Sequence, residues 1–379
     1  MKTLGFYIHI PFCESKCTYC DFNSGYLKEE DRYLKALIQE MTSYKKTFEH
    51  HTIDTIFLGG GTPSLYSSQS LEKILNTVFK NYKIKNPEIT IECNPNSLTL
   101  EKLKDLKKSG FNRISLGAQS FQDHQLKNLT RLHTSDQIRV ALNNIQKAQF
   151  KNFSFDLMYG LPLQSFEEFQ KDLEEALLFQ PPHFSFYNLT LEKIHPLYKK
   201  LPSNDLSTEM HLYAKELLES KGYDHYEVSN YAQKGCYSKH NLKYWNYEEY
   251  LGVGAGASSY LKTPPSWVDS SIPYGIRFTG VKNPLVYAQK HLEGEFPYQD
   301  IEYLTQKQNL TDYLMNRLRL QKPLDLTSLN KIYSIDFIND FSYFWVPQKD
   351  RGLLDIRQNM LSLTSKGRLF LDEIIMDFI

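Results

Sequence analysis

Short apolar runs alternate with longer amphipathic stretches through the first half of the chain. The short runs predict β-strands at residues 4–10, 53–58, 88–93, 111–116, 152–157 and 183–189. The longer stretches, with apolar residues at helical spacing, predict helices at residues 29–47, 67–80, 99–109, 134–148 and 165–179. Such alternation predicts parallel β/α units, and six of them fit a partial (β/α)6 barrel better than a complete eight-stranded one.

The pattern changes after about residue 205. A predicted helix at residues 207–221 leads into a segment rich in Tyr, Gly and Asn, and the Pro-containing residues 263–273 predict an exposed loop. The remaining residues have a helical pattern that ends in an apolar pair, a turn, the sequence LSLT and a closing helix. We therefore expect a first domain over residues 1–285 and a small helical, winged-helix-like domain over residues 286–379.

Composition limits the binding partners and the cellular compartment that we expect for the protein. Lys and Arg together number 44, as do Asp and Glu, so zero net charge argues against a broad nucleic-acid-binding surface. The sequence lacks a run of the roughly 20 apolar residues that span a bilayer. The N-terminal MKTLGFYIHIPFC is predicted to be the first strand, not a signal peptide. Three of the five cysteines fall within eight residues, which favours metal binding in a reducing, cytoplasmic setting.

The cysteine cluster is the strongest chemical motif. Cys13, Cys17 and Cys20 follow the first predicted strand with the spacing CxxxCxxC. Three thiolates on one loop can each bind a different iron of a cubane and leave the fourth iron open for an exchangeable ligand. Structural zinc is the alternative, but it normally needs four ligands, often in paired CxxC knuckles. The spacing therefore favours a [4Fe–4S] cluster.

Polar or glycine residues follow the other predicted strands. The second strand runs into Gly59–Gly61, and three later strands end near Glu92, Gln119 and Asp156. In parallel β/α proteins the ligand lies at the carboxyl ends of the strands, where a carboxylate often binds a ribose hydroxyl. A tight turn or a loop cap would explain each residue singly. Arg131 could add a positive charge facing a carboxylate, or it could be a solvated helix residue.

Five segments carry a family resemblance: YIHIPFCESKCTYCDF, GGGTPS, IECNP, GAQSF and DLMYGLP. They resemble the radical-SAM branch that contains oxygen-independent coproporphyrinogen III oxidase and the HemW haem chaperones. The resemblance implies that the open iron binds S-adenosylmethionine, which electron transfer can cleave to a 5′-deoxyadenosyl radical. It implies S-adenosylmethionine contacts from Tyr7, Gly60 and Glu92. The positions that hold a second such molecule in the oxidase are matched here by Tyr19, Gly61, Thr62, Gln119, Arg131 and Asp156.

Two features separate the branches. Phe22 stands where the oxidase has a fourth cysteine, and the oxidase also carries a segment ahead of its first strand. The sequence HNLKYW, from His240 to Trp245, resembles the HNxxYW motif of HemW. Imidazole is a common axial ligand of haem iron, and aromatic rings suit a porphyrin face. The alternative is a structural His240 packed among aromatic residues.

Three smaller points concern single residues. Cys93 and Thr130 stand where the family pattern has Ala and Gly. We expect Cys93 to be a small buried residue at a strand end. Cys236 is also expected to be structural, because no CxxCH sequence for covalent haem attachment is present.

The function that we predict is that of a HemW-type haem chaperone, which binds haem and passes it to an acceptor protein. Its cofactors would be the [4Fe–4S] cluster, S-adenosylmethionine and haem, with a reductant as a further partner. Delivery requires no turnover, so we assign no catalytic residue. The rival function is the oxidase, which decarboxylates two propionates of coproporphyrinogen III. Radical-SAM modification of RNA ranks last, because the chain lacks a basic accessory domain.

Overall fold

The structure, a computed structural model, describes residues 2–26, 29–268 and 271–378. Six parallel strands form the centre of one large sheet, in the order β1-β4-β5-β6-β7-β8. Their bounds are β1 (Lys2–Ile10), β4 (His51–Gly60), β5 (Lys83–Cys93), β6 (Arg113–Gln119), β7 (Phe153–Tyr159) and β8 (His183–Asn188). All six predicted strands are present, and the partial (β/α)6 barrel is confirmed.

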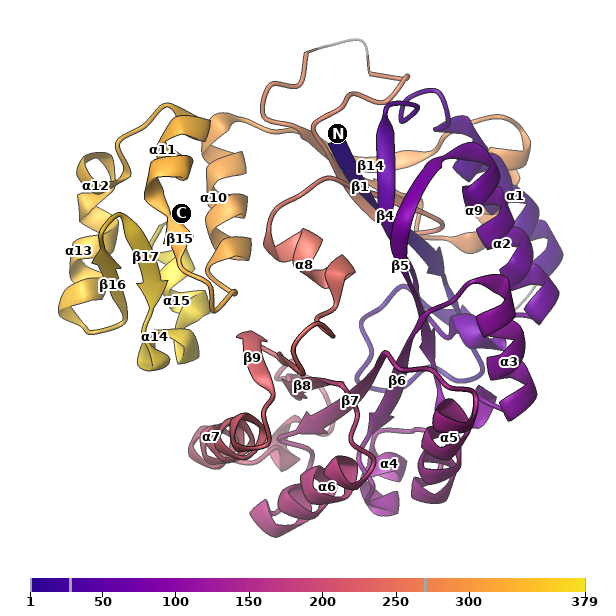
Figure 1. Ribbon diagram of the computed structural model, residues 1–379, viewed down its shortest axis with the longest axis horizontal. Helices are drawn as coiled ribbons and strands as arrows, with labels where there is room; N and C mark the ends of the chain where they lie inside the picture. Colours follow the sequence, from indigo (N-terminus) through magenta and orange to yellow (C-terminus); the bar gives the residue numbers. More distant parts are fainter. Residues whose placement is uncertain (1, 27–28, 269–270, 379) are drawn as a thin grey trace.

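The connecting helices cover the outer face of this sheet (Figure 1). They are α1 (Glu30–Ser43), α2 (Ser68–Asn81), α3 (Leu100–Ser109), α4 (Asp123–Asn128), α5 (Ser135–Lys147) and α6 (Phe166–Leu178). Hydroxyl groups of Ser67, Thr99, Thr134 and Ser165 accept backbone N–H bonds at four helix N-termini. These caps satisfy donors that the first helical turn leaves free, so the sequence fixes where the helices begin.

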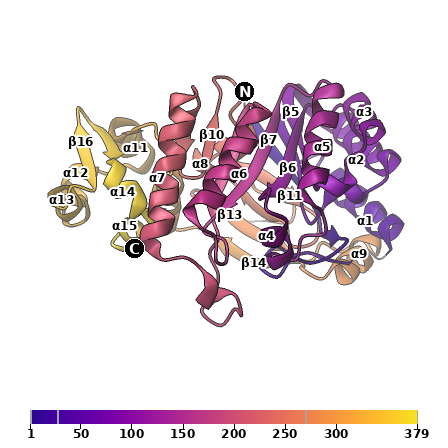
Figure 2. The ribbon, with the colours of Figure 1, turned by 90° about the horizontal axis from the view of Figure 1, so that it is seen from below.

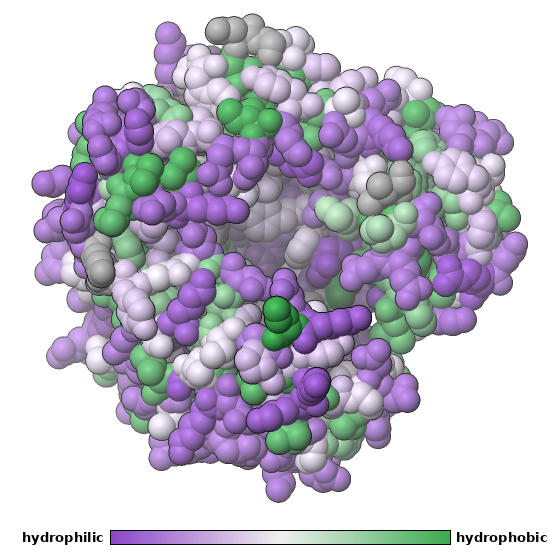
Figure 3. Space-filling model, turned by 180° about the vertical axis from the view of Figure 1, so that it is seen from behind, coloured by the Kyte–Doolittle hydropathy of each residue, from purple (hydrophilic) through white to green (hydrophobic). Residues whose placement is uncertain are grey.

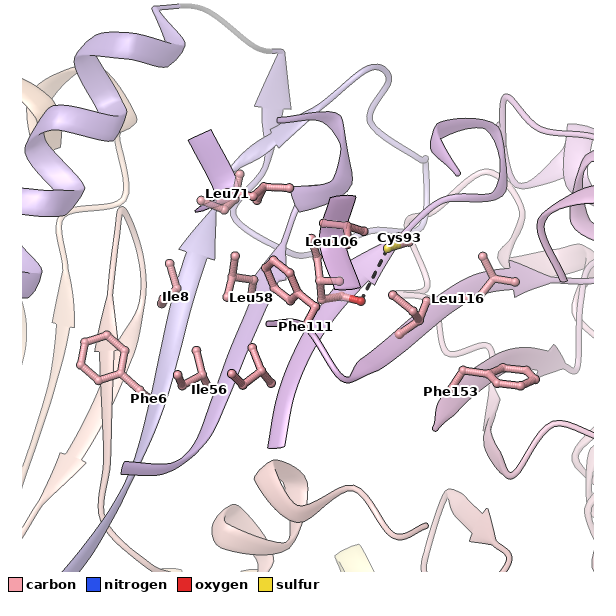
Figure 4. Close-up of a cluster of buried hydrophobic side chains, with 14 of the residues drawn as sticks. Phe6, Ile8, Ile56, Leu58, Leu71, Cys93, Leu106, Phe111, Leu116 and Phe153 are labelled. Atoms are coloured by element: carbon pink, nitrogen blue, oxygen red, sulfur yellow. Dashed lines mark hydrogen bonds between the residues drawn. The ribbon is translucent and has the colours of Figure 1, made fainter. Parts of the chain in front are cut away.

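The main hydrophobic core fills the space between the sheet and these helices. Figure 4 shows Phe6 and Ile8 of β1 beside Ile56 and Leu58 of β4, all of them fully buried. Parallel strands are covered on both faces, which explains their nearly continuous apolar sequences. The polar side chains of these strands are consequently concentrated near their carboxyl ends.

Both edges of the sheet are extended by strands that the sequence did not predict. Next to β1 lie β11 (Tyr250–Val253), which is parallel to it, and then the antiparallel β12 (Ser258–Leu261), β13 (Ile276–Gly280) and β14 (Tyr298–Tyr303). Next to β8 lie β10 (Asn230–Ala232) and β9 (Asp224–Glu227). These strands are short and rich in polar and Tyr residues, so their period-2 pattern is weak. A further pair, β2 (Phe12–Cys13) and β3 (Gly25–Tyr26), encloses the cysteine loop.

The predicted exposed loop at residues 263–273 is only partly exposed. Val268 and Ile272 are buried in the main core, while Asp269 and Ser270 lie outside the described residues.

The other helices of this region are α7 (Asn204–Ser220), α8 (Lys239–Trp245) and α9 (Pro284–Leu292). Short 3-10 turns occur at Pro63–Leu65, Pro95–Ser97 and Tyr198–Lys200.

The C-terminal residues form a separate module at one end of the molecule (Figure 2). Its helices are α10 (Gln306–Arg317), α11 (Leu326–Tyr333), α12 (Phe337–Asp340), α13 (Ser342–Asp350), α14 (Ser365–Leu369) and α15 (Leu371–Met376). Its small sheet has the order β15 (Leu324–Asp325), β17 (Met360–Leu363) and β16 (Leu354–Arg357). The winged-helix-like module is therefore confirmed.

The division between residues 1–285 and 286–379 stays a prediction. Beyond residue 285, β14 still belongs to the main sheet and α9 packs against α1. The second hydrophobic core starts at Leu310 in α10. Packing therefore favours a boundary close to Thr305.

Candidate functional site

Three cysteines lie on the loop that follows β1. Cys13, Cys17 and Cys20 are free thiols of intermediate burial. Oγ1 of Thr62 lies 3.7 Å from Sγ of Cys13, and Nη1 of Arg131 lies 3.6 Å from Sγ of Cys17. All three cysteines line one cavity of about 130 Å³ at the carboxyl ends of the parallel strands. The loop thus presents three sulfur ligands to a single space.

The donor set fits an iron–sulfur cluster better than zinc. Among the described residues, no three Cys, His, Asp or Glu side chains are placed to bind a single metal ion. Structural zinc needs four ligands around one point. A cubane instead distributes its thiolates over different irons, so three cysteines spread around one cavity suffice.

The glycine run at the end of β4 allows the cysteine loop to approach the sheet. Gly61 donates its N–H to the carbonyl of Ile10 at 2.8 Å, and a Cβ at Gly61 would lie only 2.4 Å from the carbonyl oxygen of Phe12. Gly60 has a φ of +112°, a conformation that L side chains rarely adopt. The glycines are therefore required by close packing at the cavity, which a plain surface turn would not require.

Two carboxyl groups line the same cavity from β5 and β7. Burial, with a smaller contribution from the nearby charge of Asp156, raises the pKa of Glu92 to about 7. The pKa of Asp156 is also raised to about 7 by burial, although Ser115 donates a hydrogen bond to it at 3.3 Å. Oε2 of Glu92 accepts the N–H of Gly60 at 2.9 Å. Both groups could accept hydrogen bonds from the hydroxyl or ammonium groups of a ligand, which would favour their ionised forms.

Arg131 connects the cysteine loop with the strand ends. Its Nη2 donates to Oδ1 of Asn94 at 2.6 Å and to the carbonyl of Gly117 at 3.0 Å, while Nη1 faces Cys17. The guanidinium thus lies directly beside one of the three sulfur atoms of the loop. Arg131 is therefore a cavity residue, and the alternative of a solvated helix residue is wrong.

Thr130, Tyr19 and Gln119 complete this side of the cavity. Thr130 has a φ of +56°, which explains why the family pattern has glycine there, and its Oγ1 accepts the N–H of Thr18 at 3.0 Å. Burial raises the pKa of Tyr19 to about 12, against the lowering effect of Arg131. Oε1 of Gln119 is buried on the cavity lining without a hydrogen-bond partner among the described residues. An unpaired acceptor in this position fits a ligand that brings a donor.

The cavity gathers most of the predicted site residues but leaves out two. Its lining includes Cys13, Cys17, Tyr19, Cys20, Gly60, Gly61, Thr62, Glu92, Gln119, Arg131 and Asp156. Tyr7 lies instead on a neighbouring cavity of about 740 Å³, where its hydroxyl is hydrogen-bonded to Nδ1 of His9 at 2.9 Å. His240 lines neither of these two cavities.

His240 is fully engaged within the protein. Its Nδ1 is hydrogen-bonded to Oγ1 of Thr55 and its Nε2 to the hydroxyl of Tyr244, each at 2.8 Å. The ring stacks on Phe57 with centroids 5.2 Å apart, and only 1% of the residue is exposed. Burial lowers the pKa of the imidazole to about 3. The role of His240 as a haem-iron ligand stays a prediction, and this packing favours the alternative structural role.

The sequence did not predict the 740 Å³ cavity. It lies between the sheet edge, the end of α8 and α10, and its lining includes Tyr244, Trp245, Tyr250, Arg277 and Asp312. The Tyr-rich composition of residues 226–260 was the only local signal of it. Phe22, with 63% of its surface exposed, lines both cavities and so lies where the two meet.

Comparison with known proteins places these features in a family. Residues 7–176 match the model of the Radical SAM superfamily. The chain is 35% identical to the Heme chaperone HemW of Haemophilus influenzae over 99% of this chain and 97% of that protein. It is 34% identical to the Escherichia coli protein of the same name, over 99% and 98%. The solved structure of coproporphyrinogen III oxidase (HemN) from Escherichia coli matches with a TM-score of 0.85 at 24% identity, covering 100% of this chain and 90% of that one, which shows a shared fold.

Proposed function

Since the chain belongs to the HemW family of haem chaperones, within the radical SAM superfamily, we propose that it binds haem and transfers it to an acceptor protein. One observation carries the cofactor part of this proposal. A single cavity holds three cysteine thiols, two carboxyl groups with raised pKa values and a guanidinium. That set matches the needs of a [4Fe–4S] cluster and a zwitterionic ligand with a ribose.

The chain's own residues have distinct tasks in this proposal. Cys13, Cys17 and Cys20 would hold the cluster, and the guanidinium of Arg131 lies beside the sulfur of Cys17. Glu92 would accept a hydrogen bond from S-adenosylmethionine, because its second oxygen is not used by Gly60. When bound, the reduced cluster would supply one electron, and S-adenosylmethionine would be its acceptor. Free thiols at such a site suit a reducing compartment, so we place the protein in the cytoplasm.

A second S-adenosylmethionine molecule forms a finer part of the proposal. By resemblance to the oxidase, it would be held by Tyr19, Gly61, Thr62, Gln119, Arg131 and Asp156. These residues lie on the same lining as the cysteines. Gln119 and Asp156 bring acceptors and Arg131 a donor, which suits a molecule with both amino and carboxylate groups.

The rival function shares this fold but needs a different set of side chains. Phe22 occupies the place of the oxidase's fourth cysteine and puts a phenyl ring on the wall between the two cavities. A phenyl ring offers neither a thiol nor a proton donor at that place.

The haem acceptor and the reductant of the cluster remain part of the proposal as partners. None of the helices among the described residues is long and apolar enough to cross a bilayer.

One anaerobic experiment tests the proposal against its rival. The purified protein is reconstituted with iron and sulfide, titrated with haem, and incubated separately with coproporphyrinogen III, S-adenosylmethionine and a reductant. We expect about four irons per chain, because a cubane holds that number, together with saturable haem binding and no sustained formation of protoporphyrinogen IX. Multiple turnovers of coproporphyrinogen III would place the protein with the oxidases.

A further inference from the structure

The larger cavity is formed jointly by the main sheet and the C-terminal module. The sheet contributes Tyr250, Tyr260 and Arg277, and α10 contributes Asp312 and Met315. Its volume of about 740 Å³ lies within the range of roughly 300–1,000 Å³ that is usual for small-molecule sites. The face of the molecule in Figure 3 is hollowed at its centre, and side chains of intermediate hydropathy form the floor of that hollow. The space is large enough for a bulky, flat ligand.

Aromatic rings make up much of the lining. Tyr247 and Tyr260 are stacked with centroids 4.2 Å apart, and Tyr244 meets Tyr250 edge-on at 4.6 Å. Trp245 has one face covered by the guanidinium of Arg319 at 4.4 Å. Aromatic pairs of this kind present rigid apolar surfaces with a polar tip. Such a lining suits a planar macrocycle with polar substituents at its edge.

The cavity lining also carries three cationic side chains, Arg277, Lys16 and Lys282. Nη1 of Arg277 lies 2.7 Å from Asp312 and its Nη2 lies 2.6 Å from Glu302, whereas its Nε is buried without a hydrogen-bond partner among the described residues.

The acidic residues of the lining are Asp21, Glu248 and Asp312. Two of them are already neutralised within the protein. Lys243 lies 2.9 Å from Glu248, and Asp312 accepts a hydrogen bond from Tyr247 at 3.0 Å in addition to its pair with Arg277. A carboxylate ligand could use the Nε of Arg277, which has no partner among the described residues, and replace Glu302 at Nη2. A guanidinium is well suited to bind a carboxylate with two such hydrogen bonds.

We propose that this cavity is the haem site of the protein and that Arg277 binds a propionate carboxylate of the haem. The inference rests on the proposed function and adds the place and the residue. The partly exposed rings of Tyr244 and Trp245 contact the macrocycle, and Phe22 lies between it and the cysteines. HNxxYW thus contributes to haem binding through its aromatic residues, while His240 holds Tyr244 in place.

The test compares haem with its dimethyl ester, in which both propionates are uncharged. Each ligand is titrated into the wild-type protein and into Arg277→Gln, and the Soret band is followed. A hydrogen bond to a charged group corresponds to roughly a tenfold or greater change in affinity. We expect Arg277→Gln to weaken haem binding by about tenfold or more on this basis, and to leave the ester unchanged. An equal loss for both ligands, or no loss for haem, overturns the proposal.

Two further variants separate carboxylate binding from a general loosening of the module. Asp312→Asn removes one of the two carboxylate partners of Arg277 and leaves Glu302 in place, so haem affinity should be kept or raised. If Asp312→Asn weakens haem as Arg277→Gln does, the ion pair itself is what matters and the proposal fails. Arg357→Gln changes an exposed arginine of the C-terminal hairpin, 87% exposed at the side chain, and serves as the matched charge control. A wild-type protein that binds neither ligand would refute the proposed function as well, which distinguishes the two failures.

Discussion

The hydroxyl of Tyr244 lies 2.8 Å from Nε2 of His240, so these two residues of the HNLKYW segment are hydrogen-bonded to each other. The second ring nitrogen is occupied by Thr55 at the same distance. An imidazole with both nitrogens engaged would have to break a buried hydrogen bond before it could bind iron. We therefore infer that His240 fixes the position of Tyr244, which lines the cavity of about 740 Å³.

We expect His240→Ala to lower the free energy of unfolding by about 2–4 kcal/mol, because it leaves a cavity and an unpaired Thr55 hydroxyl. The position of the Soret band in the haem complex should not change. Urea unfolding and haem titration of the same variant measure both quantities. His50→Ala, at a histidine whose side chain is 85% exposed, is the control and should behave as wild type. A folded His240→Ala protein whose Soret band shifts and is restored by added imidazole would instead identify His240 as an iron ligand, because displacement of Tyr244 alone would not respond to imidazole.

The cluster should depend on three of the five cysteines. Cys13, Cys17 and Cys20 line the cavity beside donors, so Ala at any one of them should abolish most of the iron and sulfide bound after anaerobic reconstitution. Burial raises the pKa of Cys93 to about 12, and its thiol donates to the carbonyl of Ile91, as the dashed line in Figure 4 shows. Cys93→Ala and Cys236→Ala should therefore keep the cluster. Loss of iron from Cys93→Ala as complete as from Cys17→Ala would contradict this ligand set.

The sequence was sufficient to predict the cysteine cavity, because parallel strands bring their carboxyl ends to one edge. Glu92, Gln119 and Asp156 could be assigned to one site from strand order alone, although they are far apart along the chain. The place of Tyr7 could not be predicted in this way. Tyr7 and His9 point to the opposite face of β1 from Phe6 and Ile8, and that face is covered by elements from the second half of the chain.

The larger cavity was beyond prediction for a different reason. Its residues Tyr260, Arg277 and Asp312 come from two edge strands and from a helix of another module. The strands are short, and the pairing of Arg277 with Asp312 depends on how the module packs against the sheet. Neither periodicity nor spacing contains that information. The HNLKYW segment predicts haem contacts for its aromatic residues and an iron-ligand role for its histidine, and the packing of His240 favours a structural role for the histidine alone.

Gly61→Ala should damage the cofactor site through the backbone. The added methyl group would lie 2.4 Å from the carbonyl oxygen of Phe12, which cannot move without displacing Cys13. We expect a loss of about 1–3 kcal/mol in the free energy of unfolding, as for other overpacked sites, together with poor cluster reconstitution. Gly25→Ala is the matched control, since a Cβ there meets no atom within 4 Å. Equal iron content in the two variants would show that close packing at Gly61 is not required.

The last prediction concerns the pH dependence of stability in the protein without its cluster. The pKa of Glu92 is about 7 in the folded protein, whereas its ordinary value is 4.5. Between these values the folded state holds a proton that the unfolded state has lost, so stability must fall as the pH rises through this window and then level off above about pH 7. Glu92→Gln cannot ionise and should remove this part of the slope.

The test is the difference between the wild-type protein and Glu92→Gln, because other groups act in the same pH range. Asp156 contributes with the same sign, and His133, whose pKa burial lowers to about 4, contributes with the opposite one. We expect Glu92→Gln to gain on the order of 1–3 kcal/mol over wild type between pH 5 and pH 8, measured by urea unfolding at each pH. If plots of the free energy of unfolding against pH stay parallel for the two proteins between pH 5 and pH 8, Glu92 is already ionised at pH 5. Its cavity would then stabilise the carboxylate before any ligand arrives.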